Sequence, residues 1–414
     1  MRLFIGLCML GSFAAGCSTL PDAPLPPPEP IVENQTVPQV PAQPLPEPPP
    51  APRVQMPPPA PTEPPPAPVI EAPEPSEFAA LPFWETHDPT PALSAFVRGC
   101  ETWSNAEDAS YLNPNLPQYG TYGDWRQTCQ SATILQSVDP SAKDARAFFE
   151  GWFKPVALTA PDAADGLLTG YYEPEVEVRL TPSSEFSEPI LAKPTNAAKL
   201  TLPRAQVNAS TSRVIAYGRP IDVFFLQVQG SGRLKYSDGR ILRAAYAANN
   251  GQAYRSIGAV LIARGELTRD TASKQSIDDW MQRNGPQAAR ALMNENPRYI
   301  YFTEQSIRAG EGPQGAMRVP LTGMRAIAVD PRYHPYGSLV WLETTLPTKA
   351  GDYRGQQTGV LVAAQDTGSA IKGPLRADLF FGSGDDAGER AGVQKHRAKW
   401  TLFLPIFVDS PFTS

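Results

Sequence analysis

The sequence predicts a mainly β fold with flanking helices, built around a small closed barrel. From Arg298 onward, glycine and proline separate six short apolar runs that we interpret as strands: YIYF, RAIAV, SLVWLE, GVLVAA, DLFF and WTLFLPIFV. Short strands punctuated in this way are typical of small barrels. Residues 78–160 instead carry apolar residues at helical spacing, which predicts helices before the barrel.

The middle of the chain combines predicted strands and helices. From Gly166 the segment LLTGYYEPEVEVRL alternates apolar and polar residues, and 221–230 (IDVFFLQVQG) alternates in the same way, so both are predicted strands. Helical signals follow at the apolar face of 257–262, at a capping box of Ser276 with Asp279, and at Pro286.

The first 16 residues predict a signal peptide. Arg2 provides its basic start, 3–13 its apolar core, and Ala14-Ala15-Gly16 the small residues before a cleavage point. Cys17 follows directly, and this arrangement resembles the lipobox of a bacterial lipoprotein. The resemblance implies that Cys17 is lipidated, and Ser18 after it implies sorting to the outer membrane, facing the periplasm.

A predicted tether occupies residues 17–76. Its part from Pro21 onward holds half of the chain's 48 prolines and lacks aromatic residues, so it cannot bury a core. Proline favours extended polyproline II, which indicates a spacer. A ligand for an SH3-type domain is the alternative, but an exported, lipid-anchored chain favours the spacer. The folded part is therefore expected to work at a distance from a membrane.

Composition excludes several classes of function. The formal net charge of −6 and the lack of a run dense in Lys and Arg argue against nucleic-acid binding. The three histidines are scattered, without Cys or acidic residues at ligand spacing, so no metal site is predicted. No P-loop or GxGxxG follows a predicted strand, and we expect no cofactor.

Two of the four cysteines remain in the mature folded part. Cys8 leaves with the signal peptide and Cys17 takes the lipid, whereas Cys100 and Cys129 lie in one helical region of an exported domain. Such a compartment permits disulfides, so these two are predicted to pair. A catalytic thiol is the alternative, although neither cysteine has a neighbouring histidine.

Three aspartates are candidate catalytic residues. Asp366 and Asp378 lie in QDTGSAIKGPLRADLFFGSG, and Asp330 lies in AIAVDPRYHPYG, each at the end of a predicted strand. Strand ends meet at one rim of a barrel, and packing three carboxyl groups together there raises the pKa of at least one of them, which suits acid–base chemistry. The alternative is that they cap turns. The DTGS sequence also resembles an aspartic protease, but that chemistry needs a second such motif, which the chain lacks.

Aromatic and amide side chains that suit a glycan cluster elsewhere in the sequence. Sugar rings need flat faces and directional hydrogen bonds. Turn chemistry and ordinary core tyrosines are the alternative explanation. The candidates are Thr169, Tyr171 and Tyr172 in LLTGYYEP, Gln227, Gln229 and Ser231 in LQVQGSGRL, and Tyr254 in NNGQAYRSIG.

These segments together resemble the membrane-bound lytic murein transglycosylase A family over about residues 80–410. The blocks that carry the resemblance are LTGYYEP, FFLQVQGSG, NNGQAYRSIG, AVDPRYHPYG and QDTGSAIKGPLRADLFFGSG, in this order. The resemblance implies a double-psi β-barrel domain with a second, smaller β domain inserted in it and the substrate groove between them. The implied parts are helices and the start of the barrel at 77–171, the insert at 172–296 and the barrel, or 3D, domain at 297–414.

The resemblance also implies a reaction. The family cleaves the β-1,4 bond between N-acetylmuramic acid and N-acetylglucosamine in peptidoglycan without water and leaves a 1,6-anhydro end. By motif position Asp378 becomes the acid/base, Asp366 and Asp330 support it, and Gln229-Gly230-Ser231 and the tyrosine block bind sugar. Cell-wall enzymes are possible partners. Two alternatives stay open: a non-catalytic, expansin-like wall-binding module, and a water-dependent muramidase.

Overall fold

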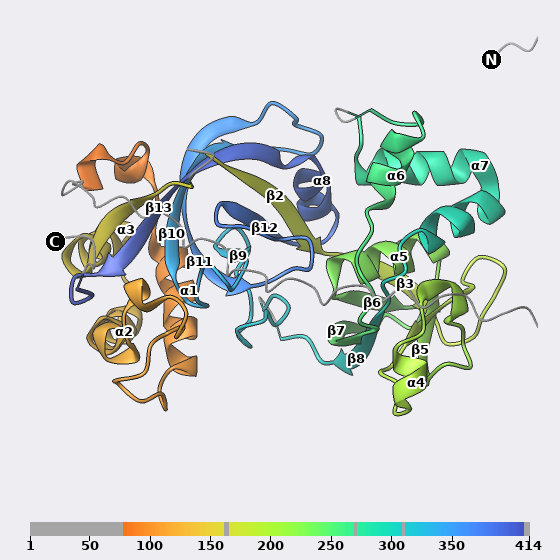
Figure 1. Cartoon of the computed structure of the whole chain (residues 1–414), viewed down its shortest axis with the longest axis horizontal. Helices are drawn as coiled ribbons and strands as arrows, with labels where there is room; N and C mark the ends of the chain where they lie inside the picture. The colour runs from red at the N-terminus through yellow and green to blue at the C-terminus, as the bar shows by residue number, and fades with distance from the viewer. Residues whose placement is uncertain (1–77, 161–164, 269–270, 309–310, 410–414) are drawn as a thin grey trace, which may run out of the picture. The chain divides into compact units, whose positions relative to one another are not determined.

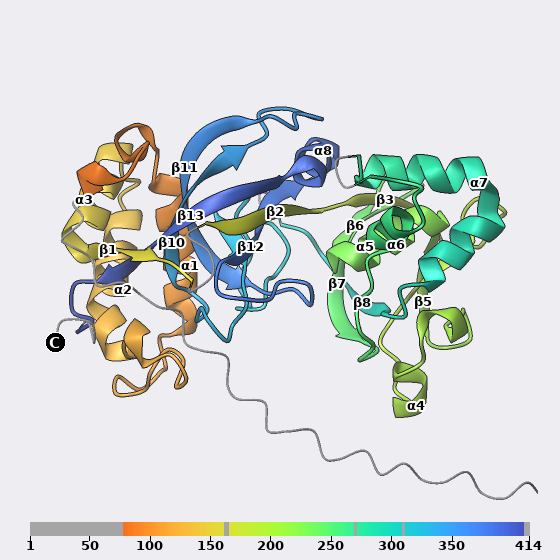
Figure 2. The ribbon, with the colours of Figure 1, turned by 45° about the horizontal axis from the view of Figure 1, so that its top comes forward.

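Figures 1 and 2 show the computed structural model, which describes residues 78–160, 165–268, 271–308 and 311–409. The described residues belong to one compact unit, and they form two barrel-like sheets with helices beside them. This confirms the predicted mainly β fold. The predicted signal peptide, Cys17 and the tether 17–76 lie outside the described residues. None of the helices in the described part is long and apolar enough to cross a membrane.

The first sheet closes into a six-stranded barrel. Its strands follow the order β13-β10-β11-β9-β12-β2, and the first half of β13 pairs back with β2. Closure leaves no free edge at this point, and the second half of β13 is covered by β1 (Phe153–Leu158). The other strands are β2 (Gly166–Glu173), β9 (Ala326–Ala328), β10 (Leu339–Leu346), β11 (Gln356–Asp366), β12 (Arg376–Ser383) and β13 (Lys395–Pro405).

Three helices pack against the end of this barrel that carries β1 (Figure 1). α2 and α3 each begin with a capping box, formed by Thr121 with Asp124 and by Ser141 with Asp144. Cys100 of α1 and Cys129 of α2 form a disulfide. The elements of this region are η1 (Phe78–Ala80), η2 (Trp84–Thr86), α1 (Thr90–Thr102), η3 (Pro117–Tyr119), α2 (Tyr122–Gln136) and α3 (Ala142–Trp152).

The second sheet has the strand order β4-β5-β3-β6-β7-β8, and a bridge between Ala192 and Phe302 brings its two ends together. Its strands are β3 (Glu175–Arg179), β4 (Glu188–Leu191), β5 (Val214–Gly218), β6 (Gly232–Tyr236), β7 (Ile241–Asn249) and β8 (Ile300–Gln305). The remaining helices are α4 (Ala197–Leu200), η4 (Arg204–Gln206), α5 (Pro220–Gln229), α6 (Ile257–Ala263), α7 (Lys274–Asn294) and α8 (Asp385–Val393).

The strand predicted at 221–230 is wrong, because this segment forms helix α5. Pro220 occupies the first turn, where its missing N–H costs nothing, and Gly230 ends the helix with φ of 85°. Val223 packs against the second sheet, whereas Phe224 packs on the side of α6 and α7. A helix buried on two sides carries apolar residues all round, and these obscure the helical period.

Two further predictions about elements need correction. The run YIYF was expected to be a barrel strand, but β8 pairs with β7 of the second sheet. We therefore propose that the insert continues to Gln305 and that the barrel domain resumes after it. Ser273, not Ser276, is the N-cap of α7, so this helix starts one turn earlier than predicted. Its kink lies at Gly285, directly before Pro286, which matches the predicted helix start there.

Glu173 joins the two sheets. This residue ends β2 of the barrel, and its carboxylate is fully buried. Its Oε1 accepts a hydrogen bond from Arg243 Nε of β7 at 2.5 Å, and its Oε2 accepts one from Arg233 Nε of β6 at 2.9 Å. Ser383 Oγ, at the end of β12, donates to the same Oε2 at 2.6 Å. One carboxylate therefore connects two strands of each sheet.

Candidate active site

Asp366 and Asp378 lie on either side of Ala328 in the barrel sheet. Strand β9 runs between β11 and β12, and Ala328 is the register partner of both aspartates. Residues in register on neighbouring strands face the same side of a sheet, and two strand spacings separate these Cα atoms by about 10 Å. The small side chain of Ala328 leaves the space between the two carboxyl groups open.

A β-bulge gives Asp366 its position. On β11 the register with β9 shifts between Ala364 and Asp366, so that Gln365 is the extra residue. The fully buried Gln365 side chain turns away and donates from Nε2 to the carbonyl of Ala95 at 2.6 Å. Bulges re-aim side chains at the rims of barrels, and here the bulge brings Asp366 opposite Ala328.

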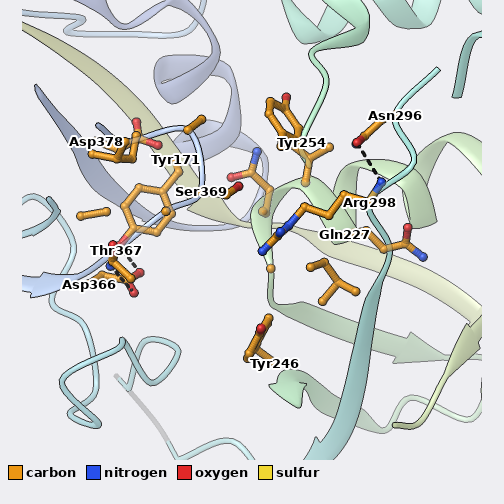
Figure 3. Close-up of a pocket in the computed structure, with 18 of the residues that line it drawn as sticks. Tyr171, Gln227, Tyr246, Tyr254, Asn296, Arg298, Asp366, Thr367, Ser369 and Asp378 are labelled. Atoms are coloured by element: carbon orange, nitrogen blue, oxygen red, sulfur yellow. Dashed lines mark hydrogen bonds between the residues drawn. The ribbon is translucent and has the colours of Figure 1, made fainter. Parts of the chain in front are cut away.

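Both aspartates line a cavity of about 310 Å³ that lies between residues of the two sheets. Figure 3 shows Asp378, Tyr171 and Asp366 on one side of this cavity, and Tyr254, Arg298 and Tyr246 facing them from the other. Small residues of the barrel, among them Gly170 and Ala328, complete the first wall. The cavity therefore offers carboxyl groups on one wall and rings and hydrogen-bonding groups on the other.

Asp378 has the properties of a general acid. Burial raises its pKa to about 6, the nearby charge of Asp366 acts in the same direction, and the hydrogen bond from Thr169 and the charge of Arg376 oppose this rise. Thr169 Oγ1 donates to Asp378 Oδ1 at 2.6 Å and accepts from Arg376 Nη2 at 2.8 Å. A carboxyl group with a pKa near neutral pH can both give and take a proton.

Asp366 is held differently. Burial raises its pKa, but three donors act against this rise: the hydroxyl of Tyr171 at 2.8 Å and the backbone amides of Thr367 and Ala316 at 2.9 and 3.0 Å. Donated hydrogen bonds favour the carboxylate. Burial also raises the pKa of Tyr171, so its hydroxyl remains a donor. Burial prevails, so the pKa of Asp366 is raised overall, but these bonds favour its carboxylate, whose charge in turn raises the pKa of Asp378.

Asp330 lies away from this cavity. It is 1% exposed, and it accepts hydrogen bonds from the Arg332 side chain and from the amide of Gly373. Burial acts to raise the pKa of Asp330, but these bonds outweigh it and lower the pKa to about 2. Asp330 therefore anchors the loop between β11 and β12 through Gly373, and it is not among the residues that line the cavity.

Of the predicted sugar-binding residues, all but Tyr172 lie at the cavity. Tyr172 is buried on the opposite face of β2 from Tyr171, where its ring packs against Gly388 of α8. Thr169 reaches the cavity through its bond to Asp378. The others line the cavity or its extension beside β7: Tyr171, Gln227, Gln229, Gly230, Ser231 and Tyr254.

Sequence reasoning missed several residues of the site. Arg376 stands two positions before Asp378 on β12, and the alternation of a strand places both side chains on one face, so this spacing could have revealed it. Tyr246 and Arg298 lie on the opposite wall, and only the folding of the second sheet brings them to the aspartates. Among the described residues, no three His, Cys, Asp or Glu side chains gather as a metal site would require.

A Thr169→Val variant is expected to raise the pKa of Asp378 above its value of about 6, because the substitution removes a hydrogen bond that lowers it. Titration of the aspartate carboxyl carbons by NMR measures this pKa. Thr344→Val is the control, because it also removes a threonine hydroxyl that makes a hydrogen bond, in this case to the carbonyl of Arg397. An unchanged or lower pKa of Asp378 in Thr169→Val would contradict the role given to Thr169.

Two family models match the chain. The MltA specific insert domain matches residues 167–216 and 202–303, and the 3D domain matches residues 325–404. A protein of Vibrio cholerae named membrane-bound lytic murein transglycosylase A is 35% identical over 312 residues, which cover 72% of this chain and 78% of that protein. The protein of the same name from Escherichia coli K12 is 38% identical over 240 residues, or 56% of this chain. The match spans 64% of that relative, less than two thirds of its length.

Solved structures give the same result. A membrane-bound lytic murein transglycosylase from Agrobacterium tumefaciens superposes with a TM-score of 0.67 at 32% identity, covering 80% of this chain and 96% of that one. Escherichia coli MltA with bound chitohexaose superposes with a TM-score of 0.60 at 29% identity, covering 75% of this chain and 89% of that one.

Proposed function

This chain belongs to the membrane-bound lytic murein transglycosylase A family, and on that premise we propose that it cleaves the β-1,4 bond between N-acetylmuramic acid and N-acetylglucosamine of peptidoglycan and leaves a 1,6-anhydromuramyl end. The observation that carries this proposal is the carboxyl group of Asp378, with a pKa of about 6, in a cavity between the two sheets.

In the proposed reaction, one carboxyl group serves both proton transfers. Protonated Asp378 gives its proton to the glycosidic oxygen while the bond from that oxygen to C1 of the muramyl residue breaks. The C6 hydroxyl oxygen of the same sugar then bonds to C1, and the carboxylate of Asp378 takes the hydroxyl proton. The acid is thereby restored.

A second catalytic carboxylate is unnecessary in this scheme. Ordinary glycosidases use two carboxyl groups because water or an enzyme nucleophile must be activated. An intramolecular hydroxyl already has a high effective concentration at C1. Asp366 instead contributes a negative charge, which raises the pKa of Asp378 and favours the positive charge that develops on the sugar ring in the transition state.

The opposite wall of the cavity is proposed to bind the glycan. Tyr254 and Tyr246 offer ring faces, and Gln229 Oε1 accepts a hydrogen bond from the amide of Tyr172, so that its amino group remains to meet a sugar. The Escherichia coli relative with bound chitohexaose supports this assignment by analogy. Aromatic rings can stack on the faces of the sugars, and amide groups can form hydrogen bonds with their hydroxyls, while the carboxyl groups on the opposite wall act on the glycosidic bond.

The proposed location follows from the N-terminal sequence and from the relatives. Residues 1–16 would be removed, Cys17 lipidated and the chain held in the outer membrane by lipid, with 17–76 as a spacer into the periplasm. The relatives' name, membrane-bound, supports an anchored protein. The proposed partners are peptidoglycan strands, with no nucleic acid.

Mass spectrometry of the products that the full-length chain releases from insoluble murein tests the proposal. We expect soluble fragments that end in 1,6-anhydromuramic acid, because the nucleophile belongs to the sugar itself. Fragments with reducing ends would instead indicate a water-dependent muramidase. Murein that sediments with the protein but releases no fragments would indicate a wall-binding module, and either result would refute the proposed reaction.

A further inference from the structure

The cavity that holds the two aspartates extends into a second region of about 680 Å³, here called the basic arm. The two share Tyr171, Asp366 and Arg298, so the arm opens directly beside the proposed cleavage site. Arg298, Arg318 and Lys372 line the arm. They come from three separate segments: the turn before β8, the loop before β9 and the loop between β11 and β12.

Within the part of the chain that the structure describes, the cations of the arm lack an acidic partner. None of Arg298, Arg318 and Lys372 forms an ion pair with a carboxylate of the described residues. Among the described residues that line the arm, Asp366 is the only acidic one. Tyr171 and two backbone amides already bind the oxygens of that carboxylate. In a chain with a net charge of −6, this leaves an unbalanced positive region.

The fold places the Arg298 side chain and the backbone segments that carry Arg318 and Lys372. Arg298 Nη1 donates to the carbonyl of Gln252 at 3.1 Å, and Figure 3 shows its guanidinium directed into the cavity. Arg318 has φ of 66°, a conformation that costs a residue other than glycine free energy. It lies in a tight turn whose Ala316 amide donates to Asp366 at 3.0 Å.

Lys372 is placed by the residues on either side of it. Ile371 is buried at 3% exposure, and the amide of Gly373 donates to Asp330 Oδ2 at 3.0 Å. Lys372 itself stays exposed at the arm. Asp330, which lies outside the cavity that holds the other two aspartates, thereby fixes the loop that carries one of the three cations.

From this arrangement, and on the basis of the proposed function, we propose that the basic arm binds carboxylates of the stem peptide attached to the muramyl residue at the cleavage site. The sugar backbone of peptidoglycan is neutral when the lactyl group of muramic acid is amidated by a peptide, so its carboxylates belong to the peptides. Arginine and lysine bind carboxylates through charge-assisted hydrogen bonds. The enzyme would thus favour strands that still carry their peptides.

A matched pair of substrates tests the role of charge. Murein is compared before and after its peptide carboxylates have been converted to carboxamides, which preserves the size of the peptides. The wild-type full-length chain is expected to cleave the untreated murein with about tenfold higher kcat/KM, mainly through KM, and added salt should reduce this preference. Equal values for the two substrates would overturn the proposal.

An Arg318→Gln/Lys372→Gln variant tests the assignment to the arm. It is expected to lose about tenfold in kcat/KM on untreated murein, to change by less than twofold on amidated murein, and to bind chitohexaose, a neutral glycan, as the wild type does. Lys235→Gln, which removes an exposed lysine of β6 outside the arm, should change neither rate. An equal loss of the double variant on both substrates would assign the two side chains to the fold or to the glycan and overturn the proposal.

Strands freed of peptides by an amidase separate the two sources of carboxylate, because they carry a free lactyl carboxylate. If the double variant loses as much kcat/KM on these strands as on untreated murein, the arm binds the lactyl carboxylate and the assignment to stem peptides is wrong. Retention of wild-type rates on them supports it. Failure of the proposed function is distinguishable, because the wild type would then release no anhydromuramyl ends from any of the substrates.

Discussion

Replacing Asp378 with asparagine is expected to lower the rate of anhydromuramyl release by about 10²- to 10⁴-fold, the usual contribution of a general acid–base group. Asparagine preserves the size of the side chain and can still accept the hydrogen bond from Thr169 Oγ1. It can neither protonate the glycosidic oxygen nor take the C6 proton. The loss is expected in kcat, with binding of chitohexaose retained.

The same substitution is expected to stabilise the fold at neutral pH. Burial raises the pKa of Asp378 from 3.8 in the unfolded chain to about 6, so the folded protein favours the protonated form. Stability linked to this group is present below about pH 4 and is lost as the pH rises through about 6. The difference of about two between the folded and unfolded pKa values of Asp378 corresponds to a loss of stability of about 3 kcal/mol at pH 8. Asparagine carries no charge and avoids this cost.

Urea unfolding at pH 4 and pH 8 measures the effect, since the gain should appear at pH 8 and vanish at pH 4. Asp330→Asn is a matched control, because it also removes a largely buried carboxylate. The pKa of Asp330 is lowered to about 2, so its contribution to stability is present above about pH 4, and its loss should destabilise the protein at pH 8. An Asp378→Asn protein that retains full activity would remove Asp378 from its proposed role, most directly in favour of Asp366.

The sequence predicted β10, β11 and β13 well because each of these strands contains a continuous run of buried residues. In β11, residues 360–364 are all buried, and such a continuous apolar run needs no knowledge of its neighbours to be identified as a strand. α5 is also buried on two sides. Its length of ten residues, Pro220 at its start and Gly230 after its end indicate a helix, but the apparent apolar alternation led to the prediction of a strand. Period alone does not distinguish a short buried helix from a strand.

The site was predictable only in part. Asp366 and Asp378 were identifiable as acids at strand ends, but their pairing across Ala328 depends on β9 entering between β11 and β12, and no local pattern encodes that order. Asp330 also follows a predicted strand, but its carboxylate forms an ion pair with Arg332, two residues later. Adjacent residues of a strand face opposite sides of the sheet, so alternation alone could have shown that Tyr171 and Tyr172 cannot both face the cavity.

Replacing Glu173 with glutamine is expected to lower the free energy of unfolding by about 3–5 kcal/mol, because the substitution leaves the buried guanidinium of Arg243 without a counter-charge and leaves Arg233 with only the partly exposed Glu175. The Arg243 side chain is only 5% exposed, so water cannot replace its lost interaction, whereas that of Arg233 is 25% exposed and can be partly solvated. The glutamine amide would also present donors to Arg243 or Arg233, which are themselves donors. Unfolding in urea, followed by tryptophan fluorescence, measures this loss.

Glu295→Gln provides the matched control. Glu295 also binds two arginines, Arg255 at 2.6 Å and Arg264 at 2.7 Å, but these side chains are 61% and 42% exposed. Exposed ion pairs contribute little, so this variant is expected to lose less than about 1 kcal/mol. Equal losses in the two glutamine variants would contradict the claim that burial makes the Glu173 cluster important.

The double variant Glu173→Gln/Arg243→Gln separates the effect of charge from that of packing. If an uncompensated buried charge causes the loss in Glu173→Gln, removing Arg243 as well should restore part of the stability. If packing dominates, the two losses should add. The cluster binds Ser383, at the end of the strand β12 that also carries Asp378, to β6 and β7. Partial recovery of stability should therefore be accompanied by partial recovery of anhydromuramyl release. Recovery of stability without recovery of activity would show that the fold tolerates a displacement of the two sheets that the reaction does not.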